Sequence, residues 1–390
     1  MRIIFVQYGD YGEAVERFEA GGEETYFAQK YSVEYVARLN QELGPVTVVC
    51  LNANAYDKIL SNGVHAIGMR IRETGGERRL RNLLTNLEPT HTIVATPLTG
   101  LLRWLSKRET RTLPLFADSF PRGGIRRYFD YRHLSRVLNT DSFPWVANHN
   151  INSSRDLARI GVDPVKIIPW DWPSSITPDG YAPKIKPGAS PFKAIYVGHL
   201  SRAKGLGDCI EAIGLLRGSP EETCLTVLAG TSPSDEFATL ARQCGAWELI
   251  HFITHRVPHP QVVALMHEHD AVLVPSRHEY PEGLPMTIYD ALCARTPLIA
   301  SDHPMFTGRI AHEQSALIFR AGDPASLANA IRRLQREPAL YASLSQQSNR
   351  AWESLQCPVK WGDLISRWLR YDEGDRAWQL SHSLASSDYQ

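Results

Sequence analysis

A short apolar run leads into a loop rich in glycine and cations over Ala194-Ile195-Tyr196-Val197-Gly198-His199-Leu200-Ser201-Arg202-Ala203-Lys204-Gly205. The run is typical of a buried strand, and the residues that follow have the apolar spacing of a helix. A helix N-terminus offers free N–H groups and a partial positive charge, and Arg202 and Lys204 add full charges. We therefore expect a strand–loop–helix unit whose loop suits an anionic ligand; a solvated loop with surface cations is the alternative.

The same alternation of strand and helix continues on both sides of this stretch. Further strands are expected at 3–7, 46–51, 92–95, 113–117, 145–147, 224–229, 249–252, 271–275 and 298–300. Helices are expected at 26–43, 205–217, 235–244, 260–267 and 285–294. This order predicts right-handed βαβ units and mainly parallel sheets covered on both faces, as in a doubly wound Rossmann-like fold.

A proline-rich segment divides the two series of strands. Six prolines and two glycines lie close together there, at positions 169, 173, 178, 183, 187 and 191 and at positions 180 and 188. Such a segment favours neither a helix nor a central strand. We expect a first domain over 1–172, a linker over 173–192 and a second domain over 193–355.

The C-terminal part of the chain has a tryptophan at each of positions 352, 361, 368 and 378. That is too much apolar surface for a free tail. We expect residues 361–390, beginning with a helix at 361–371, to pack back on the first domain; packing against the second domain alone is the alternative.

Composition excludes several classes of protein. Net charge is zero over 390 residues, so no overall field draws the molecule to nucleic acid. The six cysteines are scattered without a Cys-x-x-Cys pair, which fits neither a disulfide framework nor a zinc site. No apolar run reaches the ~18 residues of a membrane span. We expect a cytoplasmic protein.

A second informative loop follows the strand expected at 271–275. Glu282 precedes the predicted helix, Gly283 lets backbone approach a ligand, and Asp290 lies further along the helix. Two acids at this spacing can bind two separate hydroxyl-bearing parts of one elongated ligand. The alternatives are a helix N-terminal acid at Glu282 and a solvent-facing residue at Asp290.

Three motifs in this order resemble those of the retaining glycosyltransferases of family 4. The stretch from Glu282 to Asp290 is similar to the family's Glu-x7-Glu region. Val197-Gly198-His199-Leu200 with Lys204-Gly205 resembles its Val-Gly-Arg-Leu and Lys-Gly motif, and Gly21-Gly22-Glu23 resembles its Gly-Gly-x-Glu. The resemblance implies the GT-B architecture, two Rossmann-like domains facing across a cleft.

The resemblance also implies an activity and roles for individual residues. The activity is retaining transfer of a sugar from a nucleotide-diphosphate sugar to a hydroxyl acceptor, such as a glycan or lipid-linked glycan. Lys204 would contact the diphosphate, Glu282 the sugar hydroxyls and Asp290 both ribose hydroxyls. Further donor contacts are implied for Gly22, Gly198, His199, Arg202, Gly283, Leu284, Met286 and Thr287.

Three positions depart from the family pattern. The second acid of the Glu-x7-Glu region is the shorter Asp290. His199 replaces an arginine, so the second phosphate cation is either protonated His199 or Arg202. Asp118 stands where family members often have a histidine that touches the sugar, and we place it on the acceptor side.

Other functions remain open at this stage. A dehydrogenase would need a Gly-x-Gly-x-x-Gly string, which the sequence lacks. An epimerase, a phosphorylase or a catalytically silent binding protein could share the fold. No Asp-x-Asp motif is present, and the neighbours His267 and His269 do not share a helix face. We expect no metal or other cofactor, because cations and helix N-termini can stabilise a leaving diphosphate.

The acceptor is not identified by any motif. Residues 70–136 contain 14 Lys and Arg against 6 Asp and Glu. Within them, the basic segment 98–111 combines leucines and a tryptophan with cations, and could rest on an anionic membrane. The alternative is a helix packed on the sheet with a solvated basic face.

Overall fold

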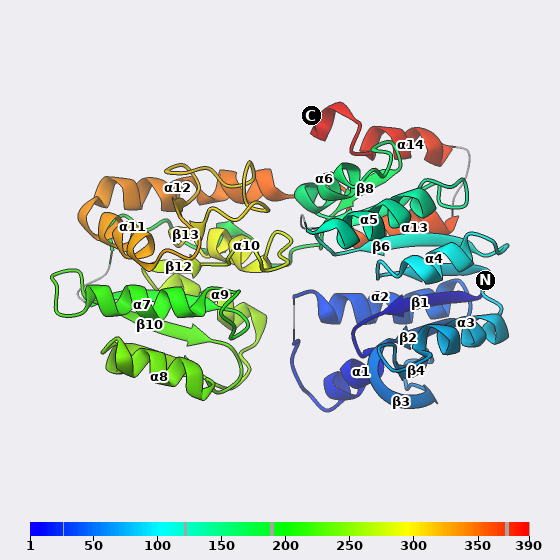
Figure 1. Cartoon of the computed structure of the whole chain (residues 1–390), viewed down its shortest axis with the longest axis horizontal. Helices are drawn as coiled ribbons and strands as arrows, with labels where there is room; N and C mark the ends of the chain where they lie inside the picture. The colour runs from blue at the N-terminus through cyan, green and yellow to red at the C-terminus, as the bar shows by residue number, and fades with distance from the viewer. Residues whose placement is uncertain (26, 121–122, 188–190, 371–373, 390) are drawn as a thin grey trace. The chain divides into compact units, whose positions relative to one another are not determined.

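The computed structural model describes residues 1–390 except residues 26, 121–122, 188–190, 371–373 and 390 and the side chain of residue 388. Residues 26, 188 and 371, which belong to predicted segments, therefore lie outside the described part. The chain forms two compact units, residues 1–173 with 357–390 and residues 174–356 (Figure 1). Residues 174–187 pack on the second unit, where the Pro178 carbonyl accepts from Arg295 and the Lys184 N–H donates to Ser345.

The first unit is built on an eight-stranded sheet in the order β3-β4-β2-β1-β5-β6-β7-β8. Its strands are β1 (Ile3–Gln7), β2 (Val46–Cys50), β3 (Asn52–Ile59), β4 (His65–Arg70), β5 (His91–Val94), β6 (Arg111–Phe116), β7 (Val146–His149) and β8 (Ile167–Trp170). Every neighbouring pair is parallel except β3 with β4, which is antiparallel.

Helices cover both faces of this sheet because its strands are apolar on both sides. Along β1, Ile3 and Phe5 enter a core with α1 (Tyr11–Glu19), α2 (Gln29–Glu42) and α13 (Trp361–Arg370). Ile4 and Val6 enter the opposite core, which contains residues of α3 (Gly76–Leu87), α4 (Thr99–Leu105), α5 (Ile125–Leu138) and α6 (Ile151–Arg159).

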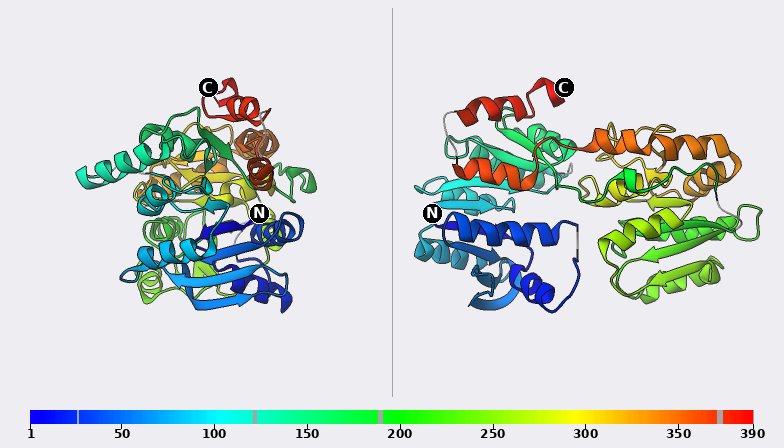
Figure 2. Two further views of the ribbon diagram at one scale, coloured as in Figure 1. Left: turned by 90° about the vertical axis from the view of Figure 1, so that its right-hand side faces the viewer. Right: turned by 180° about the vertical axis from the view of Figure 1, so that it is seen from behind.

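The C-terminal residues pack on the first unit. Trp361 and Trp368 of α13 are buried in the core of β1, and the hydroxyl of Tyr35 donates to the Gly362 carbonyl at 2.7 Å. In α14 (Gly374–His382), the Trp378 ring lies 5.4 Å from that of Trp145. Figure 2 shows this red segment along the first unit.

The second unit has a six-stranded sheet in the order β11-β10-β9-β12-β13-β14. Its strands are β9 (Phe192–Val197), β10 (Thr223–Leu228), β11 (Ile250–Ile253), β12 (Ala271–Val274), β13 (Leu298–Ser301) and β14 (Leu317–Phe319). All its neighbouring strands are parallel. Its α-helices are α7 (Leu206–Leu216), α8 (Asp235–Gln243), α9 (His259–Glu268), α10 (Met286–Cys293), α11 (Pro324–Arg336) and α12 (Pro338–Leu355).

The strand order places a topological switch point between β9 and β12. From β9 the chain adds β10 and β11 on one side, and it then adds β12, β13 and β14 on the other. Ligands of open α/β sheets bind beyond the carboxyl ends of the strands at such a point. The loops after β9 and β12 are the two predicted from sequence to hold the ligand.

Candidate active site

The loops after β9 and β12 are locked together by a close backbone approach. Gly205 has φ +84°, and a Cβ at this position would lie 2.1 Å from the Pro275 carbonyl oxygen. Arg277 in the second loop donates two hydrogen bonds, at 2.6 and 3.0 Å, to the fully buried Asp208 in the first turn of α7. Only glycine fits at 205, and the paired charges hold both loops to the same helix.

Lys204 and Glu282 meet between these two loops. Their side chains form a direct ion pair, and the whole residues are only 8% and 6% exposed. Ser276 donates to the same Glu282 oxygen at 2.6 Å, and Lys204 Nζ lies 4.9 Å from the Tyr280 ring centroid. A buried charge pair is costly unless both groups are paired and hydrogen-bonded, as they are here. The ammonium has three donors, so it can keep Glu282 and still bind an anion.

The N-terminus of α10 lies beside the end of β9. Pro285 is its N-cap and no side chain caps the helix. The Thr287 hydroxyl contacts the Val197 carbonyl at 3.4 Å, which places the first turn next to that strand. Leu284 is buried in the core, whereas Gly283 and Met286 are partly exposed. The first N–H groups of a helix have no partner within it, so this turn can donate to an anion.

Asp290 is held by a histidine from another helix. Its Oδ1 is 2.9 Å from Nε2 of His259, the first residue of α9, and both side chains are largely buried. Burial raises the pKa of Asp290, and the hydrogen bond from His259 partly offsets this rise. The contact with His259 uses Oδ1 of Asp290, not Oδ2. Sequence reasoning identified Asp290 but missed His259, because no motif links residues 31 positions apart.

A buried histidine after β13 supports the same loop. His303 Nδ1 accepts from the Met305 N–H at 3.2 Å, and its Nε2 donates to the Tyr280 carbonyl at 3.1 Å. Burial lowers the pKa of His303, which keeps the ring neutral in this role. The sequence analysis missed this residue, although its place directly after a strand was a usable signal.

Two predicted phosphate contacts have exposed side chains, unlike the buried Lys204–Glu282 pair. The Arg202 side chain is 68% exposed and forms an ion pair with Glu236 at the start of α8. The His199 side chain is exposed, and its carbonyl accepts from the Tyr196 hydroxyl at 2.6 Å. Gly198 lies between Val197 and this turn. The ion pair uses only Nε of Arg202, so the other N–H groups of the guanidinium can still bind phosphate.

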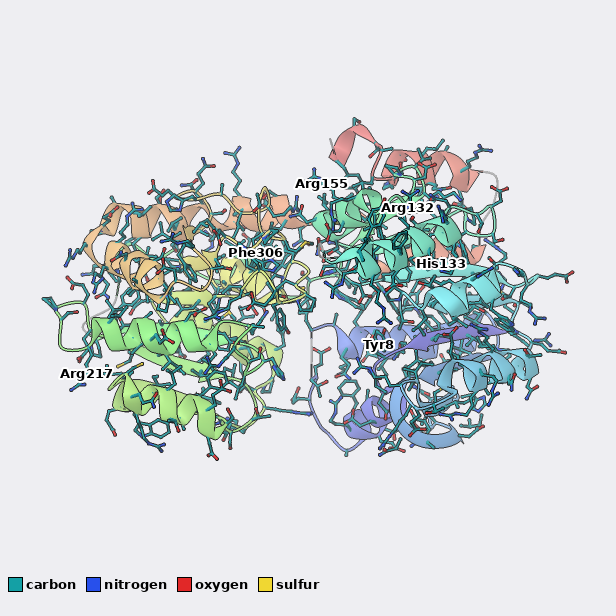
Figure 3. The ribbon with its side chains drawn as sticks, in the orientation of Figure 1. Tyr8, Arg132, His133, Arg155, Arg217 and Phe306 are labelled. Atoms are coloured by element: carbon teal, nitrogen blue, oxygen red, sulfur yellow. The ribbon has the colours of Figure 1, made fainter. Side chains whose placement is uncertain are left out.

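The predicted residues of the first unit lie after α1 and β6. The Gly22 N–H donates to the Arg17 carbonyl at 2.8 Å and so ends α1. Asp118 follows β6, where its backbone exchanges hydrogen bonds of 3.2 and 2.9 Å with the Asn148 side chain. Burial raises the pKa of Asp118 to about 6. Tyr8, labelled in Figure 3, follows β1 at the same edge of the sheet.

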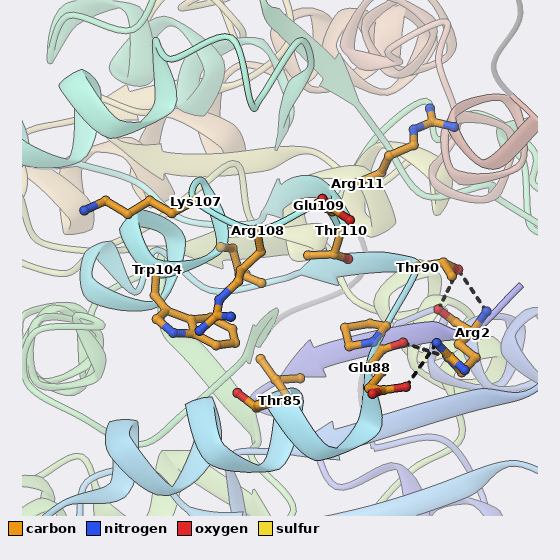
Figure 4. Close-up of a pocket in the computed structure, with 13 residues that line it drawn as sticks. Arg2, Thr85, Glu88, Thr90, Trp104, Lys107, Arg108, Glu109, Thr110 and Arg111 are labelled. Atoms are coloured by element: carbon orange, nitrogen blue, oxygen red, sulfur yellow. Dashed lines mark hydrogen bonds and ion pairs between the residues drawn. The ribbon is translucent and has the colours of Figure 1, made fainter.

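Three leucines of the basic segment 98–111 belong to the core of the first unit. Leu101, Leu102 and Leu105 of α4 are buried, so the apolar side of this helix faces the protein. A hollow of about 830 Å³ lies beside it, at the amino ends of β1, β5 and β6 (Figure 4). Two of its cations have partners: Arg2 pairs with Glu88, and Arg108 lies 4.6 Å from the Trp104 ring centroid.

His267 and His269 serve the fold. His267 hydrogen-bonds the Ala294 carbonyl, and His269 contacts the Leu265 carbonyl and the Thr226 hydroxyl at 2.7 Å each. Within the described part of the chain, no three His, Cys, Asp or Glu side chains gather as possible metal ligands. No helix of that part is long and apolar enough to cross a membrane.

A known protein family matches the second unit of the chain, which contains the Lys204–Glu282 pair. Residues 182–351 match the family model of glycosyl transferases group 1. A glycogen synthase of Mycobacterium tuberculosis is 31% identical over 154 residues, which are 40% of this chain and 36% of that protein. The matched stretch thus spans about a third of the length of this curated relative.

Solved structures extend the likeness to both units. Sucrose-phosphate synthase from Thermosynechococcus elongatus has a TM-score of 0.67 at 16% identity, covering 95% of this chain and 98% of its own. Anabaena HepE in complex with UDP-glucose has a TM-score of 0.65 at 13% identity, covering 98% and 99%. Both parallel α/β domains of the predicted GT-B fold are thereby confirmed, and residues 182–351 are similar to the glycosyl transferases group 1 family.

Proposed function

We propose that this protein is a retaining glycosyltransferase that moves a sugar from a nucleotide-diphosphate sugar to a hydroxyl acceptor. One observation carries the proposal: the buried Lys204–Glu282 pair lies at the switch point of the second sheet, beside an uncapped helix N-terminus. A cation, free N–H groups and a carboxylate are the three kinds of group that a phosphate-linked sugar needs. The family match over 182–351 and the UDP-glucose complex of HepE support it.

Each group then has a chemical role. Negative charge grows on the diphosphate oxygens as the bond to the sugar breaks. Lys204 and the first N–H groups of α10 stabilise that charge, with Gly283, Leu284, Met286 and Thr287 contributing backbone or hydroxyl donors. Glu282 accepts hydrogen bonds from sugar hydroxyls, and Asp290 accepts from the ribose hydroxyls through the oxygen that His259 leaves open.

The leaving diphosphate itself takes up the acceptor proton, so no protein nucleophile is required and the anomeric configuration is retained. We assign the further phosphate contacts to Arg202 or protonated His199 and to Gly22, and the acceptor side to Asp118. The cations and N–H groups take the part that a metal would otherwise play. The scattered cysteines favour a reducing compartment, so we place the reaction in the cytoplasm.

A thermal-shift screen of nucleotide sugars tests the proposal. One donor class should raise the melting temperature of the parent protein, and the Lys204→Gln variant should lose most of that shift. Lys186→Gln, which removes an exposed lysine of the same unit, is the matched control and should respond like the parent. If no nucleotide sugar or nucleoside diphosphate stabilises the parent, the proposed donor site is wrong.

A further inference from the structure

One helix of the first unit exposes an apolar and basic surface that the proposed reaction does not use. Residues 125–130 of α5 are all exposed, whereas Leu134, Val137 and Leu138 of its second half are buried. In the left view of Figure 2 its teal-green ribbon extends beyond the rest of the first unit. The helix is thus anchored at one end and presents the other to solvent.

The exposed half carries three large apolar side chains in a single patch. Ile125, Tyr128 and Phe129 are 78%, 53% and 62% exposed. Their i, i+3 and i+4 spacing places them on one side of the helix. The Tyr128 and Phe129 rings lie 5.6 Å apart. Single exposed apolar residues are ordinary, but a contiguous group on one helix end marks an interaction site.

Cations surround this patch almost without acids. Arg126, Arg127, Arg132 and Arg136 are all exposed, and Asp130 is the one acidic residue of α5. Arg132 donates to the Tyr128 hydroxyl at 2.9 Å, which holds the guanidinium beside the apolar patch. Arg132 and the adjacent His133 are labelled in Figure 3.

The N-terminal end of the helix adds to the positive field. Gly124 is the N-cap, no side chain caps the helix, and its first turn contains no acid. The free N–H groups therefore carry a partial positive charge at the same end as Arg126 and Arg127. Nearby, a hollow of about 360 Å³ is lined by residues that include Tyr128, Arg132 and Arg159.

We propose that the α5 surface, formed by Ile125, Arg126, Arg127, Tyr128, Phe129 and Arg132, docks on an anionic lipid bilayer. Apolar side chains flanked by cations match the layering of a bilayer surface, where acyl chains lie below phosphate groups. The tyrosine suits the interface between the two layers. Charge complementarity favours this occupant over a second copy of the chain, because two copies of α5 would bring like charges together. This inference goes beyond the proposed function and does not depend on the donor site.

Vesicle flotation of the full chain tests the proposal. The parent should bind phosphatidylcholine vesicles that contain about one-third phosphatidylglycerol, and should bind pure phosphatidylcholine weakly. Raising the salt concentration from about 0.1 M to about 1 M should release the protein, because the Debye screening length falls to ~3 Å. Arg126→Gln with Arg127→Gln should weaken binding roughly thirtyfold, at about a factor of five per cation. Ile125→Ser with Phe129→Ser should abolish insertion, whereas Phe129→Trp should preserve it with a blue-shifted emission.

Matched variants remove equivalent groups elsewhere. Ile59→Ser with Ile185→Ser removes two side chains that are 70% and 71% exposed, and Arg217→Gln with Arg376→Gln removes two exposed arginines. These controls should bind like the parent, and circular dichroism should show all variants folded. The proposal is overturned if the parent does not bind acidic vesicles, or if the α5 variants bind as well as the controls. It is also overturned if sedimentation shows a dimer that the α5 variants convert to monomer.

Discussion

At the residue scale, Lys204 and Glu282, two of the residues proposed to hold the donor, form a buried ion pair. Read as a lysine in an exposed loop, Lys204 would be dispensable for folding. The structure instead buries it against Glu282, so its removal would leave an unpaired carboxylate in the protein. Nor did any motif indicate Ser276 or His259, because these partners reach Glu282 and Asp290 only through the fold.

The pairing decides which Lys204 variant is informative. Lys204→Gln keeps one hydrogen-bond donor for Glu282 but removes the positive charge that stabilises the leaving diphosphate. Turnover at saturating donor and acceptor should fall about 10²- to 10³-fold, while the variant stays folded. Lys204→Ala should in addition lower the melting temperature, because Glu282 loses its partner. Release of nucleoside diphosphate measures turnover. If Lys204→Gln turns over at nearly the parent rate, Lys204 does not stabilise the leaving diphosphate.

The Asp290–His259 pair predicts a pH dependence of donor binding. Asp290 must be ionised to accept from two ribose hydroxyls, and burial raises its pKa above the usual aspartate value. Donor affinity should therefore fall as the pH decreases through this raised pKa. His259→Ala removes the partner that lowers the pKa of Asp290, so the loss should begin at a higher pH.

At neutral pH, His259→Ala should weaken donor binding roughly tenfold, as expected for one lost charged hydrogen bond. Calorimetric titration with a nucleoside diphosphate across the pH range measures both effects. His255→Ala removes an exposed histidine of the same unit and serves as the control. If the pH profile of donor binding is unchanged in His259→Ala, Asp290 does not bind the ribose hydroxyls as proposed.

At the element scale, five of the six strands of the second unit were predicted to within two residues from their buried apolar runs, whereas β14 was not predicted. The antiparallel edge strand β3 was missed because its residues alternate between exposed and buried and include several polar ones. The helix predicted from residue 26 begins at Gln29, and its N-cap is Ala28, a residue type that gives no capping signal in the sequence. The strands β4 and β8 were also not predicted, although β8 is buried along its whole length, so a short apolar run does not by itself identify every buried strand.

The contact between the β9 and β12 loops makes Gly205 a test of how the elements build the site. Gly205→Ala must move either the Pro275 backbone or the loop carrying Lys204, because the new Cβ would lie 2.1 Å from a carbonyl oxygen. It should lower the melting temperature and weaken donor binding at least tenfold, since strained backbone costs about 1–3 kcal/mol. Gly218→Ala is the matched control, with φ +66° and open space around the added carbon. If both variants lose stability and donor affinity equally, the cause is the positive φ of the backbone and not the contact with Pro275.

The C-terminal helix α13 is a structural part of the first unit. Trp368 is fully buried in the core of β1, so Trp368→Ala should cost about 3–5 kcal/mol of unfolding free energy. Truncation after residue 355 should give insoluble or unstable protein for the same reason. Urea denaturation measures the first effect, and Leu380→Ala, at a half-exposed position of α14, should leave stability nearly unchanged. A soluble, active truncated protein would contradict this packing.

At the scale of the whole molecule, the alternation of strands and helices was enough to predict two parallel α/β domains, and the motifs predicted the family that residues 182–351 match. The acceptor could not be predicted, because acceptor recognition has no fixed motif here. The composition of the basic segment 98–111 suggested a membrane contact, but Leu101, Leu102 and Leu105 of this segment are buried in the core. The exposed apolar residues of α5 became visible only once burial separated them from similar residues inside the protein.

We propose that this chain transfers a sugar from a nucleotide donor with retention. The most direct test is a proton NMR time course with the donor found by thermal shift and a hydroxyl acceptor. The anomeric signal of the donor should disappear as a product signal of the same anomeric configuration appears, and Lys204→Gln should slow both changes together. An inverted product, or a bound donor that the parent never consumes with any acceptor, would contradict the account.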